Sequence, residues 1–177
     1  MLLPPSAAAQ AARYNRENRE HFTPWDPARP KGFYQESFWA AQLERNLAEL
    51  DDDRGVRFWI LDREDDEIIG TANFNNLVRG VFQSCTLGYG IHFRREGNGY
   101  MHEALHEAIR YVFDELKVHR IQANYLPENQ RSARLLARLG FEIEGRAKDY
   151  LLIAGQWRDH VLTSLTNEHY KVPPPES

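Results

Sequence analysis

The sequence predicts a mixed α/β fold, in which helices flank a central β-sheet. A stretch with strand character, residues 83–93, leads through a glycine loop directly into a helix. In that helix Met101, Leu105, Ile109 and Val112 recur at spacings of three and four. With 177 residues, 42% of them hydrophobic, the chain can bury one core but is too short for two ordinary domains. We therefore expect a single domain over residues 1–168 and a flexible tail at 169–177.

The individual elements follow from local patterns. Apolar residues at helical spacing predict helices near residues 6–20, 34–51, 98–116 and 130–139. Runs rich in β-branched and aromatic residues predict strands near residues 56–63, 67–78, 83–93, 118–125, 141–153 and 157–166. Charged residues 62–67 form a turn between the first two strands. Gly140 closes the fourth helix, and Phe141 starts the next strand.

The glycine loop, residues 94–100, has the chemistry of a phosphate site. The unpaired N–H groups of a first helical turn and the positive end of the helix dipole attract an anion, and Gly97 and Gly99 let it approach the backbone. Position 102 is histidine, which excludes a dinucleotide-binding fingerprint, and no Gly-Lys-Ser/Thr is present for a Walker loop. Alone, the loop is also compatible with a plain hairpin before a surface helix.

A second motif follows about thirty residues later, with Asn129, Ser132, Gly140 and Phe141 in fixed spacing. Together with Arg94-x-x-Gly97-x-Gly99 it resembles the GNAT superfamily of N-acetyltransferases. Their pyrophosphate loop reads Gln/Arg-x-x-Gly-x-Gly/Ala, and their second motif reads Asn-x-x-Ser/Ala followed by Gly-Phe. The resemblance implies a mixed sheet that is splayed between two central parallel strands and flanked by helices.

Within that superfamily, residues 21–25, 68–76, 119–121 and 148–162 are similar to the RimJ type of ribosomal-protein-alanine N-acetyltransferases, and the resemblance covers about residues 10–168. It implies transfer of acetyl from acetyl-CoA to the N-terminal amine of a protein, in the type case the N-terminal alanine of the fifth small-subunit ribosomal protein. One departure concerns the first strand, because only three residues precede Pro4-Pro5. Either that strand is truncated to a stub or the start codon is placed too late; without it, the neighbouring edge favours pairing with another chain.

The resemblance also assigns a cofactor site between the parallel strands that end near Phe93 and Tyr125. It gives the pantetheine arm to the backbone of Ile91, His92 and Phe93 and to Asn129, with Ser132 at the sulfur. It gives the pyrophosphate to Arg94, Arg95, Gly97, Asn98, Gly99, Tyr100 and Met101. The acceptor is expected on the opposite side, against Phe22, Pro24, Trp25, Asn73 and Asn75. The alternative for the aromatic group around Trp25 is a lid over the core.

Acetyl transfer needs a neutral amine, a polarised thioester carbonyl and a proton for the leaving thiolate. An α-amine with a pKa of about 7.7–8.0 is roughly a tenth neutral at pH 7, so it needs only modest help from a base. A water relayed by Glu103, Tyr125 or Asp149 would suffice, and the sequence does not choose among them. Glu103 fits an exposed helix charge equally well, and Asp149 a solvated strand residue.

For the acid, many relatives carry tyrosine seven residues after the asparagine, where this chain has Leu136. Ser132, one turn after Asn129, is then the expected donor to the CoA sulfur. Its alternative is a helix-capping role.

Composition excludes several other classes. The net charge of −4 argues against a general or sequence-specific nucleic-acid binder. Cys85 is alone and no Cys/His cluster has zinc spacing, so we expect no internal disulfide, no metal and a reducing compartment. The first residues lack the basic start and apolar stretch of a signal peptide, and no segment approaches the ~20 apolar residues of a membrane helix. We expect a cytoplasmic protein, monomeric or dimeric.

Two other functions stay open on the sequence alone. An acetyltransferase for a small-molecule amine, a polyamine or an antibiotic, would share every CoA motif and differ in its acceptor. A non-catalytic CoA-binding, ribosome-associated module would keep the phosphate loop without turnover.

Overall fold

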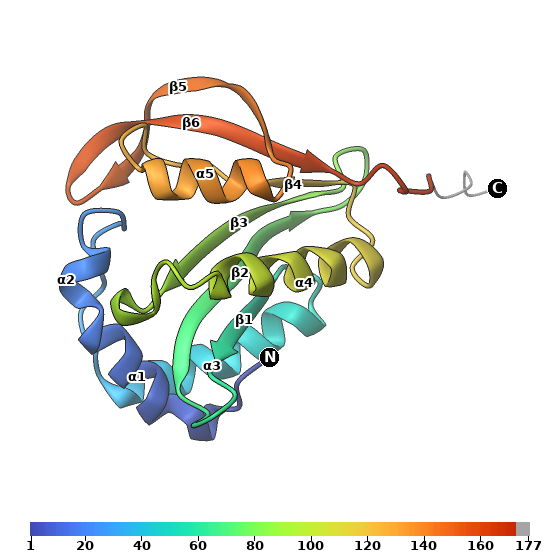
Figure 1. Cartoon of the computed structure of the whole chain (residues 1–177). Helices are drawn as coiled ribbons and strands as arrows, with labels where there is room; N and C mark the ends of the chain where they lie inside the picture. The colour runs from blue at the N-terminus through green and yellow to red at the C-terminus, as the bar shows by residue number, and fades with distance from the viewer. Residues whose placement is uncertain (173–177) are drawn as a thin grey trace.

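The computed structural model describes residues 1–172, and a six-stranded sheet runs through it in the order β1-β2-β3-β4-β6-β5 (Figure 1). The tail predicted at 169–177 lies outside the described residues from position 173 onwards. All neighbouring strands are antiparallel except β3 and β4, which are parallel. The strands are β1 (Val56–Leu61), β2 (Ile68–Val78), β3 (Ser84–Ile91), β4 (Arg120–Gln122), β5 (Glu142–Ile153) and β6 (Gln156–Thr166).

The helices occur where the apolar spacing predicts them, with one break. They are η1 (Pro5–Ala7), α1 (Ala8–Glu17), α2 (Arg19–Phe22), α3 (Glu36–Asp51), η2 (Phe93–Arg95), α4 (Tyr100–Asp114) and α5 (Gln130–Arg138). The continuous helix expected at 6–20 is interrupted at the buried Asn18. Its side-chain amide donates to Tyr14 O at 2.8 Å and its oxygen accepts from Phe93 N at 3.0 Å, so hydrogen bonds to the side chain compete with a regular helix here.

The parallel strands separate soon after they pair. β3 and β4 are in register only from Ser84–Arg120 to Thr86–Gln122. Beyond Gln122 the chain stays with β6, since the N–H groups of Ala123 and Tyr125 donate to Thr163 O and Val161 O at 3.0 and 3.1 Å. The expectation of a strand over 118–125 was therefore too long, because the last residues keep a partner on one side only. β3 and β4 therefore splay apart in a V, and beyond Thr86 the edge of β3 that faces away from β2 has no strand partner among residues 1–172. We call this region the V-shaped opening.

Two apolar clusters occupy the two faces of the sheet. Alternation along β1 separates them: Val56, Phe58 and Ile60 face one cluster, and Trp59 and Leu61 face the other. The first cluster is covered by α4 and α5, and the second by α1 and α3 (Figure 1).

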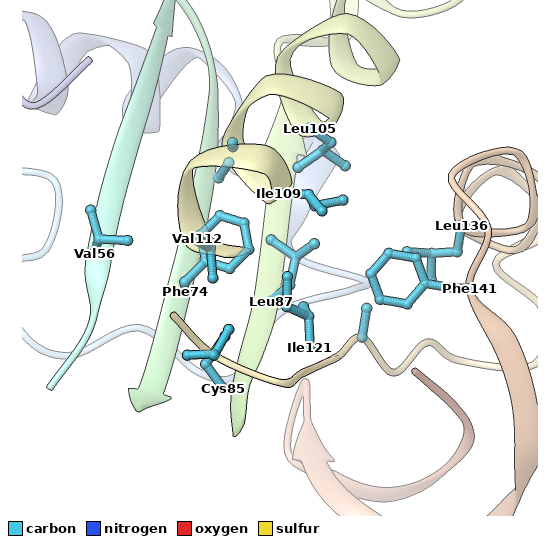
Figure 2. Close-up of a cluster of buried hydrophobic side chains, with 14 of the residues drawn as sticks. Val56, Phe74, Cys85, Leu87, Leu105, Ile109, Val112, Ile121, Leu136 and Phe141 are labelled. Atoms are coloured by element: carbon cyan, nitrogen blue, oxygen red, sulfur yellow. The ribbon is translucent and has the colours of Figure 1, made fainter. Parts of the chain in front are cut away.

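The larger cluster fixes α4 over the sheet. Figure 2 shows Leu105, Ile109 and Val112 of α4 directed onto Phe74 and Leu87, and the cluster continues to Leu136 of α5 and to Phe141. Phe74 is completely buried, so its truncation to alanine would cost about 3–5 kcal/mol of unfolding free energy. The start of α4, where the phosphate loop ends, is thereby held rigidly.

The amino-terminal segment pairs with the edge of β1. The Met1 amino group donates to Trp59 O at 2.9 Å, and Trp59 N donates back to Met1 O at 2.8 Å. Within residues 1–172 no named strand precedes β1, and these two bonds are the pairing that the first residue makes with it. Over the same residues, no helix is long and apolar enough to cross a membrane.

Candidate active site

The loop between β3 and α4 has the geometry of an anion site. Gly97 and Gly99 have φ of +79° and +85°, a region that residues with a Cβ rarely adopt. A Cβ built at either glycine would meet no atom within 4 Å. The glycines are therefore required by the backbone conformation, and the space in front of them is open to a ligand.

The backbone N–H groups of this loop are donors without acceptors. Glu103 N is the first of α4 to donate, to Gly99 O at 3.1 Å. For residues 96–102 the structure gives the N–H groups no acceptor among residues 1–172. Unpaired N–H groups at the start of a 15-residue helix attract an anion through both hydrogen bonds and the helix dipole. A pyrophosphate fits this donor set.

The charged side chains around the loop divide into paired and unpaired ones. Arg95 is bound to Asp62 of the β1–β2 turn at 2.8 Å, which anchors the loop. Glu96 is paired with Arg131 of α5 and with His21 at 3.3 Å, so its negative charge is compensated near the anion site. Arg94 lies over the Phe93 ring, 5.2 Å from its centroid, and has no carboxylate partner among the described residues. Arg94 is thus the arginine available to a phosphate.

The end of β3 offers a narrower set of backbone donors than the sequence suggests. His92 N donates to Ile69 O at 2.7 Å, and Phe93 N donates to Asn18. Because successive N–H groups of a strand point to opposite edges, the Ile91 N–H points away from β2, toward the opening. The His92 ring shapes the turn itself, since its Nδ1 accepts from Arg94 N at 3.2 Å.

Across the opening, Ser132 of α5 meets a tyrosine of β3. The Asn129 side chain accepts from Ser132 N at 3.1 Å, so Asn129 caps α5 and the Ser132 hydroxyl does not. That hydroxyl is 2.5 Å from the Tyr89 hydroxyl. Burial raises the pKa of Tyr89 to about 12, against the opposing effect of the bond to Ser132. At neutral pH both groups are uncharged hydroxyls that can pass a proton.

Tyr89 was absent from the residues expected from the sequence. Strand alternation was the available signal, because Leu87, Tyr89 and Ile91 all contact the core on the α4 side of the sheet. The motif Asn-x-x-Ser named Ser132 but gave no indication of what lies opposite it, since β3 and α5 are far apart in the chain.

The other expected proton-transfer residues lie in different surroundings. Tyr125 is buried, is bridged to Val161, and its charge in the ionised form contributes to the raised pKa of Tyr89. The Glu103 side chain is 72% exposed and lies 3.9 Å from Arg63. Asp149 is exposed, and its N–H donates to Asp159 at 2.9 Å. Among the described hydrogen bonds, neither Glu103 nor Asp149 is bonded to Ser132 or Tyr89. The proton-transfer roles of Tyr125, Glu103 and Asp149 remain predictions.

A cavity of about 320 Å³ lies on the other face of β3, under α1 and α3. It is lined by residues from helices and from three strands, among them Tyr14, Phe22, Trp39, Asn46, Arg57, Thr71, Asn73, Tyr89 and Gly90. Of the expected acceptor residues, Phe22 and Asn73 line it. Pro24, Trp25 and Asn75 do not: Trp25 lies at the surface with 38% exposure, and Asn75 O accepts from the Thr86 hydroxyl at 3.1 Å.

Gly90 is where this cavity approaches the V-shaped opening. A Cβ at Gly90 would lie 3.2 Å from Phe22 Cζ, so a larger residue here would require the Phe22 ring to shift by a few tenths of an ångström. The Tyr14 hydroxyl donates to Gly90 O at 3.2 Å. The residue just before Gly90 is Tyr89, whose hydroxyl reaches Ser132. An acetyl donor bound in the opening and an acetyl acceptor bound in the cavity would therefore meet at this point of β3.

Residues 1–142 match the family model described as an acetyltransferase (GNAT) domain. The chain belongs to the GNAT acetyltransferase family. Enzymes of this family use acetyl-CoA. The predicted family and its splayed, helix-flanked sheet are thus confirmed.

Individual relatives agree in sequence and in structure. The chain is 51% identical over 159 residues to the [ribosomal protein uS5]-alanine N-acetyltransferase of Escherichia coli (strain K12), covering 90% of this chain and 82% of that protein. It superposes with a TM-score of 0.94 on the ribosomal-protein-S5-alanine acetyltransferase from Vibrio fischeri, at 36% identity over 97% of this chain and 94% of that one. Mycobacterium smegmatis RimJ, solved in complex with CoA-disulfide, gives a TM-score of 0.87 at 30% identity over 99% and 82%.

Proposed function

We propose that this protein transfers the acetyl group of acetyl-CoA to the N-terminal alanine of ribosomal protein uS5, in the cytoplasm. The observation that carries the proposal is that the edge of β3 at the V-shaped opening and a cavity of about 320 Å³ adjoin at Tyr89-Gly90. The 51% identity to a uS5-alanine N-acetyltransferase supports the choice of acceptor.

The residues of the opening fit acetyl-CoA. The N–H groups of residues 96–102 and the Arg94 guanidinium hold the pyrophosphate, and Gly97 and Gly99 allow it to approach the loop. Asn98 shapes the loop, because its amide donates to Arg95 O and Glu96 O at 3.3 and 3.1 Å. The Ile91 N–H and the cap at Asn129 flank the pantetheine arm. Acetyl-CoA supplies the acetyl group as an activated thioester.

The protein then has to position an amine and protonate a thiolate. A neutral α-amine in the cavity attacks the thioester carbonyl from the side of Gly90, and the bond from that carbon to sulfur breaks. The Ser132 hydroxyl gives its proton to the departing sulfur, and Tyr89 returns one to Ser132 along their hydrogen bond. Tyr89 then regains a proton from water. The proton lost by the amine also goes to water, and of the three predicted relays it is Tyr125 whose charge acts on the pKa of Tyr89.

The test is mass spectrometry of ribosomal proteins from a strain that lacks this gene, beside its parent. We expect uS5 to carry an acetylated N-terminal alanine in the parent and a free amine in the deletion strain, with acetylation restored by the gene on a plasmid. Full acetylation of uS5 in the deletion strain would contradict the proposal.

A further inference from the structure

Asp26 is a carboxylate in the cavity for which the transfer reaction described above has no use. It follows α2 and lines the cavity together with Tyr14, Asn73 and Gly90. Its side chain is 31% exposed, and its Oδ2 is bound to Arg29. The other oxygen, Oδ1, accepts no hydrogen bond from any residue in the described part of the chain.

The backbone holds this carboxylate in place from two sides. Asp26 N donates to Phe22 O at 3.1 Å, and Asp26 O accepts from Ala154 N at 3.2 Å. The first bond fixes Asp26 to the end of α2, and the second to the turn between β5 and β6. Arg29 is itself held over the Phe33 ring, 4.4 Å from its centroid. A carboxylate with one free oxygen is therefore positioned rigidly rather than left on a mobile surface segment.

The electrostatics place Asp26 near the point of transfer. Burial first, and then the negative charge of Asp26, raise the pKa of Tyr14. Both side chains belong to residues that line the cavity, and the Tyr14 hydroxyl donates to Gly90 O. Burial also raises the pKa of Asp26 itself, while Arg29 and then His21 oppose the shift.

We propose that the free oxygen of Asp26 binds the α-ammonium group of the incoming protein beside Gly90, where the group loses a proton to water before it attacks as the neutral amine. This inference rests on the proposed function and adds the group that recognises a free amino terminus. An ammonium group donates strong, charge-assisted hydrogen bonds to a carboxylate, whereas a blocked amide nitrogen does not. Arg29 holds one oxygen and leaves the other for the substrate, so Asp26 acts as a binding residue that selects its acceptor by charge.

The test compares two peptides on Asp26→Asn: an alanine-initiated uS5 peptide, and the same peptide with its amine already acetylated. We expect the KM of the free peptide to rise at least about tenfold, while the Kd values of the blocked peptide and of acetyl-CoA stay unchanged. Asp53→Asn is the matched control, because Asp53 is also paired with an arginine, Arg79, but does not line the cavity. Equal weakening of both peptides would indicate a structural role and overturn the inference, as would no weakening of either.

A second measurement avoids any dependence on folding of the variant. On the wild-type protein, a peptide whose alanyl residue is replaced by propionyl, which removes only the amine, should bind at least about tenfold more weakly than the alanyl peptide. Equal binding would overturn the inference. If the wild type fails to acetylate the alanyl peptide, the proposed function falls; if it acetylates that peptide and Asp26→Asn behaves like wild type, only the role of Asp26 falls.

Discussion

The proposed acetyl-CoA side and the proposed acceptor side of the site, called the donor side and the acceptor side below, are built from different groups. The donor side is mainly backbone: the N–H groups of residues 96–102, two glycines with positive φ, and the free edge of β3. The acceptor side is mainly side chains, which come from α1, α3, the segment after α2, and strands β1 to β3. A site made of backbone groups depends on glycines at a fixed local spacing. A site made of side chains collects residues that are far apart in the chain.

The largest expected effect on turnover is at the Ser132–Tyr89 hydroxyl pair, beside the point where the two sides adjoin. Ser132→Ala should lower kcat roughly 10–100-fold with unchanged affinity for acetyl-CoA, because proton donation to sulfur stabilises the transition state and not the bound state. Tyr89→Phe should lower kcat in the same direction, and the double variant should be no slower than Ser132→Ala, since Tyr89 acts through Ser132. Steady-state kinetics and calorimetric titration measure both quantities. Near wild-type turnover in Ser132→Ala would leave that hydroxyl no part in the reaction.

The pH dependence of kcat/KM tests which kind of amine the acceptor side receives. If a free α-amine reacts, kcat/KM should rise roughly thirtyfold between pH 6 and 8 and then level off. Because burial raises the pKa of Tyr89 to about 12, the Tyr89–Ser132 pair stays protonated between pH 6 and 8. The pair therefore adds no second pH-dependent change to the kcat/KM profile. A rise that continues towards pH 10 would identify a lysine or another strongly basic amine as the acceptor.

The donor side alone is tested at Gly99. Gly99→Val should raise the Kd of acetyl-CoA more than about tenfold, because a side chain enters the space where the pyrophosphate approaches. Gly80→Val is the matched control: Gly80 also has positive φ, +68°, with no atom within 4 Å of a built Cβ, but it lies in the β2–β3 turn. Both variants should lose about 1–3 kcal/mol of stability through backbone strain, and only one should lose affinity. Unchanged affinity in folded Gly99→Val would remove the phosphate site from this loop.

The smallest effect is expected at the rim of the acceptor side. Trp25→Ala should raise the peptide KM several-fold and leave the acetyl-CoA Kd unchanged, because the indole offers contact area to a peptide but not to the cofactor. Its exposed position outside the cavity lining agrees with a modest effect. Full activity in this variant, together with faster turnover of a polyamine, would favour a small-molecule acceptor.

The same difference in construction explains what the sequence could predict. Gly97, Gly99 and Asn129 are required by local backbone geometry, so their spacing alone predicted the glycine loop before α4 and the cap of α5. The length of β4 depends on where β3 and β6 run, and local propensity carries no information about that. The break at Asn18 likewise depends on Phe93, which lies far away in the chain.

Site residues that pair across the fold were the hardest to predict. Tyr89 of β3 meets Ser132 of α5, and Asp26 lines the cavity with its backbone bound to the β5–β6 turn. Neither contact follows from periodicity or from a short motif. Aromatic residues near a loop, such as Trp25, were a visible signal, yet the structure places Phe22 and not Trp25 in the cavity wall.

The most direct test is an in vitro reaction of the purified protein with acetyl-CoA and a peptide that carries the alanine-initiated N-terminus of uS5. We expect a single acetyl group on the α-amine of that alanine, located by fragmentation mass spectrometry, and no acetylation of the same peptide when its amine is blocked. No acetylation of the free peptide at any pH, with acetylation of a polyamine under the same conditions, would contradict the assignment of a protein amino terminus as the acceptor.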